Sequence, residues 1–315
     1  MKTTTLGFTN IPVSSLCLGA MYFGTHNDEA TSFRLLDIYV EAGGFFIDTA
    51  NIYSRWVEGF RGYESEALLG RWMKARKNRS KLFLATKVGF EIPCYGVERG
   101  LPAATIIQEC EKSLRNMGVE TIDLYYAHCD DRNTPLEESL HAFDQLVKAG
   151  KVRTIGASNY MAWRLEEARW TSQVHGWSKY CCVQQRYTYL RPKPGASFYP
   201  QLVVNDDLQQ YCKRHSMTLL VYSALLGGAY SRNDREIQTQ YLGADTDARL
   251  KALEKVAKGR GITVNQVILA WMLHSDPVVL PLIAASTEEQ LRENIQALEV
   301  SLSQDEMKLL TEAAG

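Results

Sequence analysis

Four ionisable side chains occur where predicted β-strands end in the first half of the chain. Asp48 ends the apolar run GGFFID, Lys87 ends LFLATK and His128 ends IDLYYAH, while Tyr53 lies in the loop after Asp48. The carboxyl ends of neighbouring parallel strands share one edge, so the four side chains are expected to lie together. A phenol, an ammonium, a carboxylate and an imidazole at one place are suited to proton transfer.

Tyr53 is the candidate proton donor of this group. A phenol with a pKa of roughly 10 is a poor acid at neutral pH, but a nearby ammonium stabilises the phenolate and lowers that pKa. Lys87 would supply this charge, and Asp48 would offset the cost of burying it. His128 would donate a hydrogen bond to a substrate oxygen. The set predicts the reduction of a carbonyl group, or the reverse reaction.

Each of these residues also has an ordinary structural interpretation. A tyrosine is commonly a half-buried packing residue, and an aspartate after a strand is often a helix cap. Lys87 is harder to explain in this way, because a lysine at the mouth of a barrel needs a partner charge. The functional interpretation therefore depends on the four residues occurring together.

The elements that would position these residues alternate along the chain. Short β-rich runs are followed by a loop and a helix-period segment, which is the pattern of βα units in an α/β protein. The candidate strands end near Leu18, Asp48, Lys87, His128, Ser158, Gln185, Ser223 and Ile283. Eight such units predict a closed (β/α)8 TIM barrel, with residues 1–315 forming a single domain.

Two segments show the helical period clearly. Four apolar residues share a face after each of Pro102 and Pro135. The two sets are Ile106, Cys110, Leu114 and Met117, then Leu136, Leu140, Phe143 and Val147. Outside the eight units, the sequence predicts an N-terminal β-hairpin over Leu6–Val13 below the barrel and an extra C-terminal helix over Ser303–Ala313.

The composition restricts the classes of partner. The chain carries 35 Lys+Arg and 36 Asp+Glu, a net charge of -1, so no overall field attracts nucleic acid or an anionic membrane. There is no signal-peptide pattern and no run of about 18 apolar residues. The seven cysteines form no CxxC pair, and we expect reduced thiols in a cytoplasmic protein without a metal site. Only His128 of the six histidines ends a strand, which argues against a metal-dependent hydrolase.

Six segments, taken in order, resemble the aldo-keto reductase superfamily. They are DTANIY, ESEALLGRWMK, LATKVG, TIDLYYAHCDD, LEESLHAFDQLVKAGKVRTIGASNY and LLVYSALLGG. The resemblance covers nearly the whole chain. It implies a catalytic tetrad of Asp48, Tyr53, Lys87 and His128, and a nicotinamide cofactor bound without a Rossmann domain. The chain contains no GxGxxG motif, in agreement with this implication.

The resemblance also implies a set of cofactor contacts at the strand ends. The residues expected at the nicotinamide are Ser158, Asn159, Gln184 and Tyr222. The residues expected along the pyrophosphate are Ser223, Leu225 and Gly227, and Gly19, Ala20 and Asp48 complete this part of the site. The residues expected at the adenosine end are Ser286, Thr287, Gln290 and Asn294.

The adenosine end departs from the commonest pattern of the family. A lysine or arginine usually precedes the EQL segment, whereas this chain has the residues AAST at 284–287. Hydroxyl groups can bind a 2'-phosphate, and Arg292, Arg232 or Arg235 could supply positive charge. We expect NADP(H) as the cofactor, and NAD(H) remains an alternative.

The substrate is expected to meet aromatic and arginine side chains. The candidate contacts are Tyr22, Tyr53, Arg55, Trp56 and His128, with Phe60, Arg61, Tyr187, Tyr189 and Arg191 in the flanking loops. Such a set suits a polar substrate with an apolar side, such as a sugar. The alternative is an aromatic rim that packs against its own loops.

A second function is compatible with the same residues. The β-subunits of voltage-gated potassium channels resemble this family and retain the tetrad, so a cofactor-binding regulatory subunit with little turnover is the alternative to an enzyme. The sequence predicts a small-molecule partner and does not predict an oligomeric state.

Overall fold

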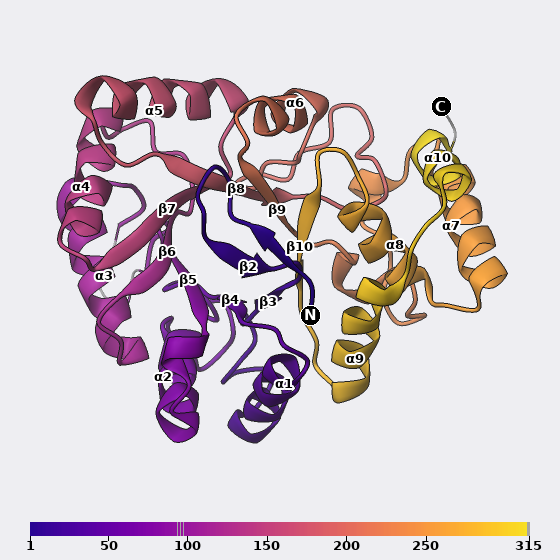
Figure 1. Cartoon of the computed structure of the whole chain (residues 1–315), viewed down its shortest axis with the longest axis horizontal. Coiled ribbons are helices and arrows are strands. Elements are labelled where there is room, and N and C mark those ends of the chain that lie inside the picture. The colour runs from indigo at the N-terminus through magenta and orange to yellow at the C-terminus, as the bar shows by residue number, and fades with distance from the viewer. Residues whose placement is uncertain (93, 95, 97, 314–315) are drawn as a thin grey trace.

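The computed structural model describes residues 1–92, 94, 96 and 98–313. Eight parallel strands close into a barrel, with helices around its outside (Figure 1). The strands follow one another in chain order, and the last closes the barrel by pairing with the first. They are β3 (Cys17–Gly19), β4 (Phe46–Asp48), β5 (Phe83–Val88), β6 (Ile122–Ala127), β7 (Val152–Ser158), β8 (Tyr180–Arg186), β9 (Thr218–Tyr222) and β10 (Val279–Ile283). This architecture confirms the predicted (β/α)8 barrel.

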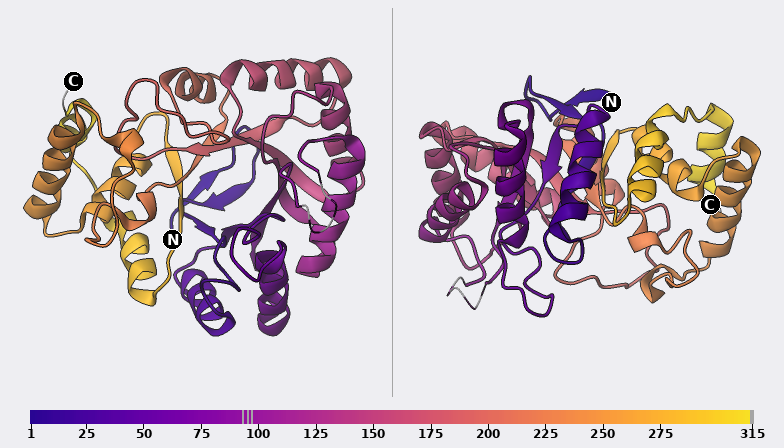
Figure 2. Two further views of the ribbon diagram at one scale, coloured as in Figure 1. Left: turned by 180° about the vertical axis from the view of Figure 1, so that it is seen from behind. Right: turned by 90° about the horizontal axis from the view of Figure 1, so that it is seen from below.

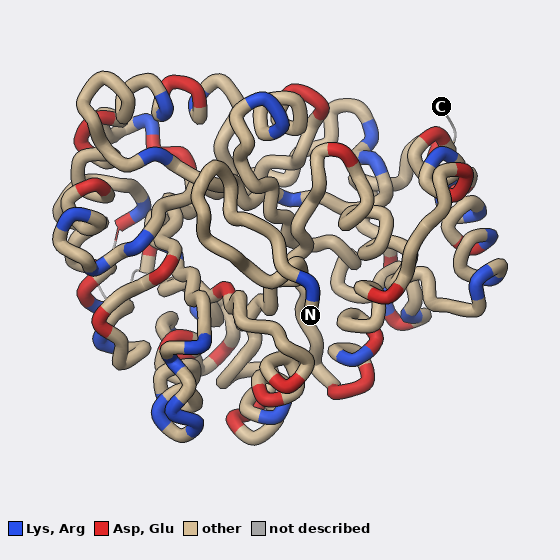
Figure 3. Tube along the Cα trace, in the orientation of Figure 1, with Lys and Arg blue, Asp and Glu red and all other residues tan. Residues whose placement is uncertain are grey.

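Ten α-helices cover the described chain. They are α1 (Glu29–Glu41), α2 (Glu64–Arg76), α3 (Ala103–Met117), α4 (Leu136–Lys148), α5 (Ala162–His175), α6 (Asp206–Arg214), α7 (Thr246–Arg260), α8 (Val264–Leu273), α9 (Glu288–Gln296) and α10 (Gln304–Glu312). Charged residues lie mainly on these outer helices, whereas the barrel strands carry few (Figure 3). The extra C-terminal helix is α10, and Ser303 caps its N-terminus as part of a capping box.

The two helices predicted from their apolar period are α3 and α4. All four residues of the predicted α3 face are buried, and the helix ends at Gly118, which has a φ of 64°. On α4 the prediction holds in part. Leu140 and Phe143 are buried, but Leu136 and Val147 are only half-buried, because they lie in the terminal turns at the edge of the core.

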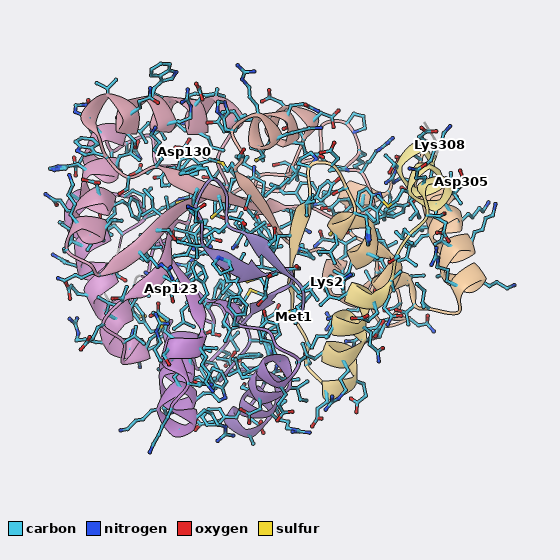
Figure 4. The ribbon with its side chains drawn as sticks, viewed as in Figure 1. Met1, Lys2, Asp123, Asp130, Asp305 and Lys308 are labelled. Carbon is cyan, nitrogen blue, oxygen red and sulfur yellow. The ribbon has the colours of Figure 1, made fainter. Side chains whose placement is uncertain are left out.

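The N-terminal hairpin closes one end of the barrel, opposite the long loops (Figure 2). Its strands are β1 (Thr3–Thr5) and β2 (Pro12–Ser14), so the predicted range 6–13 is mostly the turn between them. The turn sits directly on the barrel: a Cβ at Gly7 would lie 2.0 Å from the carbonyl oxygen of Cys181. Met1 and Lys2 fasten the chain beside it by donating to backbone carbonyl oxygens (Figure 4).

Apolar side chains fill the barrel above this hairpin. We call this group the lower core, and its members are Leu6, Val13, Cys17, Phe46, Phe83, Ala85, Leu124, Tyr126, Cys181, Cys182, Leu220 and Leu280. The rings of Phe46 and Phe83 meet edge to face at 5.1 Å. Among the described residues, no helix combines the length and apolar character needed to span a membrane.

Candidate active site

Lys87 lies at the centre of a polar cluster at the carboxyl end of the barrel. It is fully buried, and its Nζ donates to the Asp48 carboxylate, to the Thr49 carbonyl oxygen at 2.8 Å and to the Tyr53 hydroxyl at 2.7 Å. Asp48 ends β4 and pairs in register with Ala85, two residues before Lys87. Neighbouring parallel strands therefore bring the carboxylate and the ammonium together, as the strand ends predicted.

Two opposed effects act on the pKa values of the buried pair Asp48 and Lys87. Burial raises the pKa of Asp48 and lowers the pKa of Lys87, while the opposite charge of each group counteracts the shift in the other. Gln184 adds a third interaction, because its Nε2 donates to Asp48 Oδ2 at 2.9 Å. The arrangement satisfies the carboxylate from two sides and leaves the ammonium directed at Tyr53.

Tyr53 lies in the loop between β4 and α2, over a small apolar cluster of its own. Ala50, Ile52, Tyr63 and Ile92 form this cluster, and the Tyr53 ring packs against it. The phenol oxygen lies 3.4 Å from Asp48 Oδ1, and the side chain is half-buried. The ring is thus held by apolar contacts while its hydroxyl meets the polar cluster.

The pKa of Tyr53 differs from the expectation. Burial raises the pKa of this phenol well above its ordinary value, and the nearby Asp48 carboxylate raises it further. The direction predicted from Lys87 is therefore wrong, because burial and the Asp48 carboxylate both disfavour the phenolate. Tyr53 is consequently protonated at neutral pH and holds a proton that it can donate.

His128 directly follows β6, and its ring lies near that of Tyr53, with 6.2 Å between centroids. Burial lowers the pKa of His128 well below its ordinary value, and the positive charge of Lys87 lowers it further. The imidazole is therefore neutral at pH 7. Its Nδ1 is buried without a hydrogen-bond partner among the described residues. The edge of Phe90 packs on the ring at 4.8 Å between centroids.

Polar side chains also end the next strands around the barrel. Asn159, which follows β7, links the ends of β6 and β9. Its Nδ2 donates to the His128 carbonyl oxygen at 3.0 Å, and its Oδ1 accepts from Tyr222 Oη at 2.7 Å. Ser158 and Gln184 lie beside it with almost no exposure. The nicotinamide residues predicted from the family resemblance are thus gathered next to the Asp48 and Lys87 pair.

Left-handed backbone follows several of these side chains. Ser54, Asn159 and Ser223 have φ angles of 74°, 58° and 60°, and each comes directly after a predicted site residue. Such angles are costly for residues other than glycine and concentrate at functional sites. The turn after β9 continues with Gly227 at 65°, and a Cβ there would meet nothing within 4 Å.

The adenosine-end residues lie in the turn before α9 and on α9 itself. Gln290 Oε1 accepts from the Ser286 amide at 2.8 Å, and Asn294 Nδ2 donates to the Ala284 carbonyl oxygen at 3.2 Å. The Thr287 side chain caps α9. These side chains therefore shape the turn. Ser286 and Thr287 are exposed, and the Thr287 hydroxyl already accepts from the Gln290 amide.

Two of the three arginines predicted near this turn are already engaged with acids. Arg292 lies 3.5 Å from Glu288, and Arg232 binds Asp234. Glu288 is also bound by Arg34 of α1 at 2.9 Å, a contact that the sequence did not predict. Gly19 and Ala20 lie at the end of β3, where Ala20 pairs by its amide with the Asp48 carbonyl oxygen.

The predicted substrate residues separate into two groups. Trp56 lies beside Tyr53, with 6.3 Å between ring centroids, and about half of its surface is exposed. Tyr22 is half-buried in the loop after β3, where its ring meets His26 edge to face. The loop of Tyr22 touches the loop of Tyr53, because Ser54 Oγ donates to the Met21 carbonyl oxygen.

The second group is directed elsewhere. Tyr187 and Tyr189 pack on Trp271 of α8, Tyr189 is buried, and Arg191 reaches Asp245 at 3.8 Å and the Thr311 carbonyl oxygen. Arg55 is bound to Glu91 at 2.9 Å. For Tyr187 and Tyr189 the alternative of a rim packing on its own scaffold is correct, because Trp271 offers them a buried aromatic contact.

Two features of the site had little sequence signal. The carbonyl oxygen of Thr49 accepts from Lys87, and a backbone acceptor leaves no mark on residue type. Phe90 lies three residues after Lys87, and only its position in a loop after a site strand could have indicated its contact with His128. Among the described residues, no group of His, Cys, Asp or Glu side chains is placed to hold a metal ion.

Comparisons with known proteins agree with this geometry. The model of the Aldo/keto reductase family matches residues 15–314. The norsolorinic acid reductase stcV of Emericella nidulans is 34% identical over 315 aligned residues, covering 94% of this chain and 77% of that protein. The uncharacterized oxidoreductase YrpG of Bacillus subtilis is 33% identical, covering 99% of this chain and 95% of that protein.

A solved structure gives the same result in three dimensions. The thermostable aldo-keto reductase Tm1743, crystallised with the inhibitor epalrestat, superposes with a TM-score of 0.78 at 29% identity, covering 98% of each chain. The barrel, the strand-end cluster and these relatives lead to one assignment. The chain belongs to the aldo/keto reductase family of oxidoreductases.

Proposed function

We propose that this protein reduces the carbonyl group of an aldehyde or ketone with a nicotinamide cofactor, and that Tyr53 donates the proton. The observation that carries the proposal is the position of Lys87 Nζ, 2.7 Å from the Tyr53 hydroxyl and bound to Asp48. A phenol that is protonated at neutral pH and joined to a buried ammonium can donate its proton and stabilise the phenolate that remains.

The residues at the mouth of the barrel fit a nicotinamide cofactor. Ser158, Gln184 and Tyr222 offer two polar groups and a half-buried ring beside the catalytic cluster. The backbone at Gly227 is open, so a pyrophosphate meets no side chain at that position. We propose that Ser158, Asn159 and Gln184 hold the carboxamide and that Tyr222 stacks on the ring.

The cofactor, when bound, supplies a hydride to the carbonyl carbon. The substrate oxygen lies between Tyr53 and His128, where the neutral imidazole orients it with a hydrogen bond. Tyr53 Oη transfers its proton to that oxygen, which completes the alcohol. Lys87 stabilises the resulting phenolate, and Asp48 maintains the charge and direction of Lys87.

We propose NADP(H) as the preferred cofactor, supported by the exposed position of Ser286 and Thr287. Because the nearby arginines are bound to acids, we expect only modest discrimination against NADH. The acids in the first turn of α9, Glu288 and Glu289, also oppose a phosphate dianion at that helix end.

The substrate proposed here carries its carbonyl on an apolar or aromatic body. Trp56 and Phe90 flank Tyr53 and His128, whereas Arg55, Tyr187 and Tyr189 are engaged elsewhere. Because Arg55, Tyr187 and Tyr189 are not available to bind hydroxyl groups of a substrate, the site is less suited to a sugar. Relatives named norsolorinic acid reductases support a reductase activity for this chain.

A cofactor and substrate panel tests the proposal. Thermal unfolding with NADPH, NADP+, NADH and NAD+ identifies the bound cofactor, and NADPH oxidation is then followed with 4-methylbenzaldehyde, acetophenone and xylose. The proposal expects stabilisation by NADPH and fastest turnover with an aromatic carbonyl. Preference for xylose would restore the sugar hypothesis. Tight NADPH binding without turnover on any carbonyl would favour the regulatory alternative.

A further inference from the structure

Arg99 places a cation beside the mouth of the site, in the loop between β5 and α3. Its guanidinium lies over the ring of Phe90, 5.1 Å from the centroid, and the same ring packs on His128 at 4.8 Å. It also contacts the thiol of Cys129, the residue after His128. Resting on the proposed carbonyl reduction, we propose that Arg99 binds a carboxylate carried by the substrate.

The charge of Arg99 is not neutralised by a partner of its own. No ion pair joins it to a carboxylate within residues 1–92, 94, 96 and 98–313. Glu91 lies within electrostatic range of Arg99, but the guanidinium of Arg55 already binds that acid at 2.9 Å. The Glu91 carboxylate is therefore paired with Arg55 and not with Arg99.

Another arginine shows what a purely structural stacking contact looks like. Arg132 lies over the ring of Trp163 at 5.1 Å, the same distance as Arg99 from Phe90. Unlike Arg99, it forms an ion pair with Asp130 at 3.1 Å. The stacking geometry is common to both, and only the Arg99 cation is free to receive an anion.

Tyr199, in the loop after β8, contacts the Arg99 guanidinium. Its side chain is 81% exposed, its hydroxyl lies 3.4 Å from Arg99 Nη1, and the guanidinium lies over its ring at 5.6 Å. The cation is thus placed between two aromatic rings contributed by the loops after β5 and β8. Aromatic faces fix the plane of a guanidinium and leave its edge to bind a carboxylate through two hydrogen bonds.

The position of Arg99 defines the substrate that it would select. One aromatic ring, Phe90, separates the guanidinium from His128, the residue proposed to orient the carbonyl oxygen. A flat substrate with a carbonyl at one end and a carboxylate at the other would meet both residues. The inferred class is therefore an aromatic aldehyde or ketone that carries a carboxylic acid.

Two para-substituted benzaldehydes, one with an anionic and one with a neutral substituent, test this inference. The values of kcat/KM for 4-carboxybenzaldehyde and 4-methylbenzaldehyde are compared in wild type, Arg99→Gln and the matched control Arg132→Gln. We expect wild type to prefer the carboxylate by ~10- to 100-fold, the range for a charge-assisted hydrogen-bonded pair, mainly through KM. Arg99→Gln should lose this preference with little change for the methyl compound, and Arg132→Gln should retain it. Thermal unfolding of each variant controls for folding.

The outcomes separate this inference from the proposed function. A carboxylate preference that is absent in wild type, or that survives Arg99→Gln, overturns the role of Arg99 while leaving carbonyl reduction intact. If neither aldehyde is reduced, the proposed function fails, and the carboxylate site is tested by titrating tryptophan fluorescence with terephthalate. Binding that Arg99→Gln weakens and Arg132→Gln does not would support the site even then, and equal binding by all three proteins would refute it.

Discussion

The two ends of the barrel use the same strands for opposite purposes. At the hairpin end the inward side chains form the lower core, where Phe46 and Phe83 meet in an apolar contact. Two residues further along β4, at the other end, the inward side chain is Asp48, which the ammonium of Lys87 on β5 contacts. The character of the interior therefore changes within a single step of the strand period.

This change is repeated around the barrel. The lower-core residues Tyr126, Cys182 and Leu220 are followed two positions later by His128, Gln184 and Tyr222. Left-handed backbone is found beside the second set, as at Asn159 and Ser223. The lower core thus stabilises the fold. The polar cluster at the other end holds side chains and backbone in arrangements that are costly for folding.

Lys87→Met should have the largest effect, because Lys87 contributes both to catalysis and to the stability of the buried pair with Asp48. We expect kcat to fall by at least ~10²-fold, as Tyr53 loses its stabilising charge. The unfolding free energy should also fall, by up to about 3–5 kcal/mol, because Asp48 remains buried without its cation. Steady-state rates and urea unfolding measure the two effects. In the double variant Asp48→Asn/Lys87→Met, stability should recover and kcat should not; near-native kcat in the single variant would contradict the role of Lys87.

Phe83→Ala isolates the opposite end. Removing a buried ring from the lower core should lower the unfolding free energy by about 3–5 kcal/mol. The rate per folded molecule should not change, since the ring belongs to the lower core and packs on Phe46. Urea unfolding and active-site titration check the two statements. A large loss of kcat with intact stability would show that the lower core controls the site directly.

The pH dependence of stability should reveal the buried imidazole. His128 has a lowered pKa in the folded state, so the unfolded chain binds a proton that the folded chain does not as the pH falls through about 6.5. Unfolding free energy should therefore decrease from pH 7.5 to pH 5. The decrease should be smaller in His128→Gln than in wild type, while His175→Gln on the surface serves as the control. Equal slopes for wild type and His128→Gln would argue against a neutral buried His128.

Ser223→Gly should give the smallest effect. Ser223 has a φ of 60°, which glycine adopts without steric cost, so the unfolding free energy should rise by at most about 1 kcal/mol. Ser158→Gly, in a strand without such backbone, should instead lower it by roughly 0.5–1 kcal/mol. Thermal unfolding of both variants makes the comparison, and a loss at Ser223 as large as that at Ser158 would show that the turn needs the serine side chain.

The strand-end residues could be predicted because each follows an apolar run, and parallel strands bring such positions to one edge. Asp48, Lys87 and His128 needed only this rule, and Tyr53 needed only a short loop after it. The direction of loop side chains could not be predicted, because the partner of Tyr189 is Trp271, far away in the chain. The pKa of Tyr53 is also higher than the sequence predicts, because the burial that raises it depends on the packing of the whole barrel.

Tyr53→Phe tests the central claim most directly. Single-turnover reduction of 4-methylbenzaldehyde by NADPH is measured in wild type and in the variant, together with the NADPH Kd from fluorescence and the unfolding temperature. The variant keeps the ring that packs on the apolar cluster and loses only the hydroxyl. We predict a rate at least ~10²-fold lower, with unchanged NADPH binding and stability. A variant that transfers hydride at a near-native rate would contradict the assignment of Tyr53 as the proton donor.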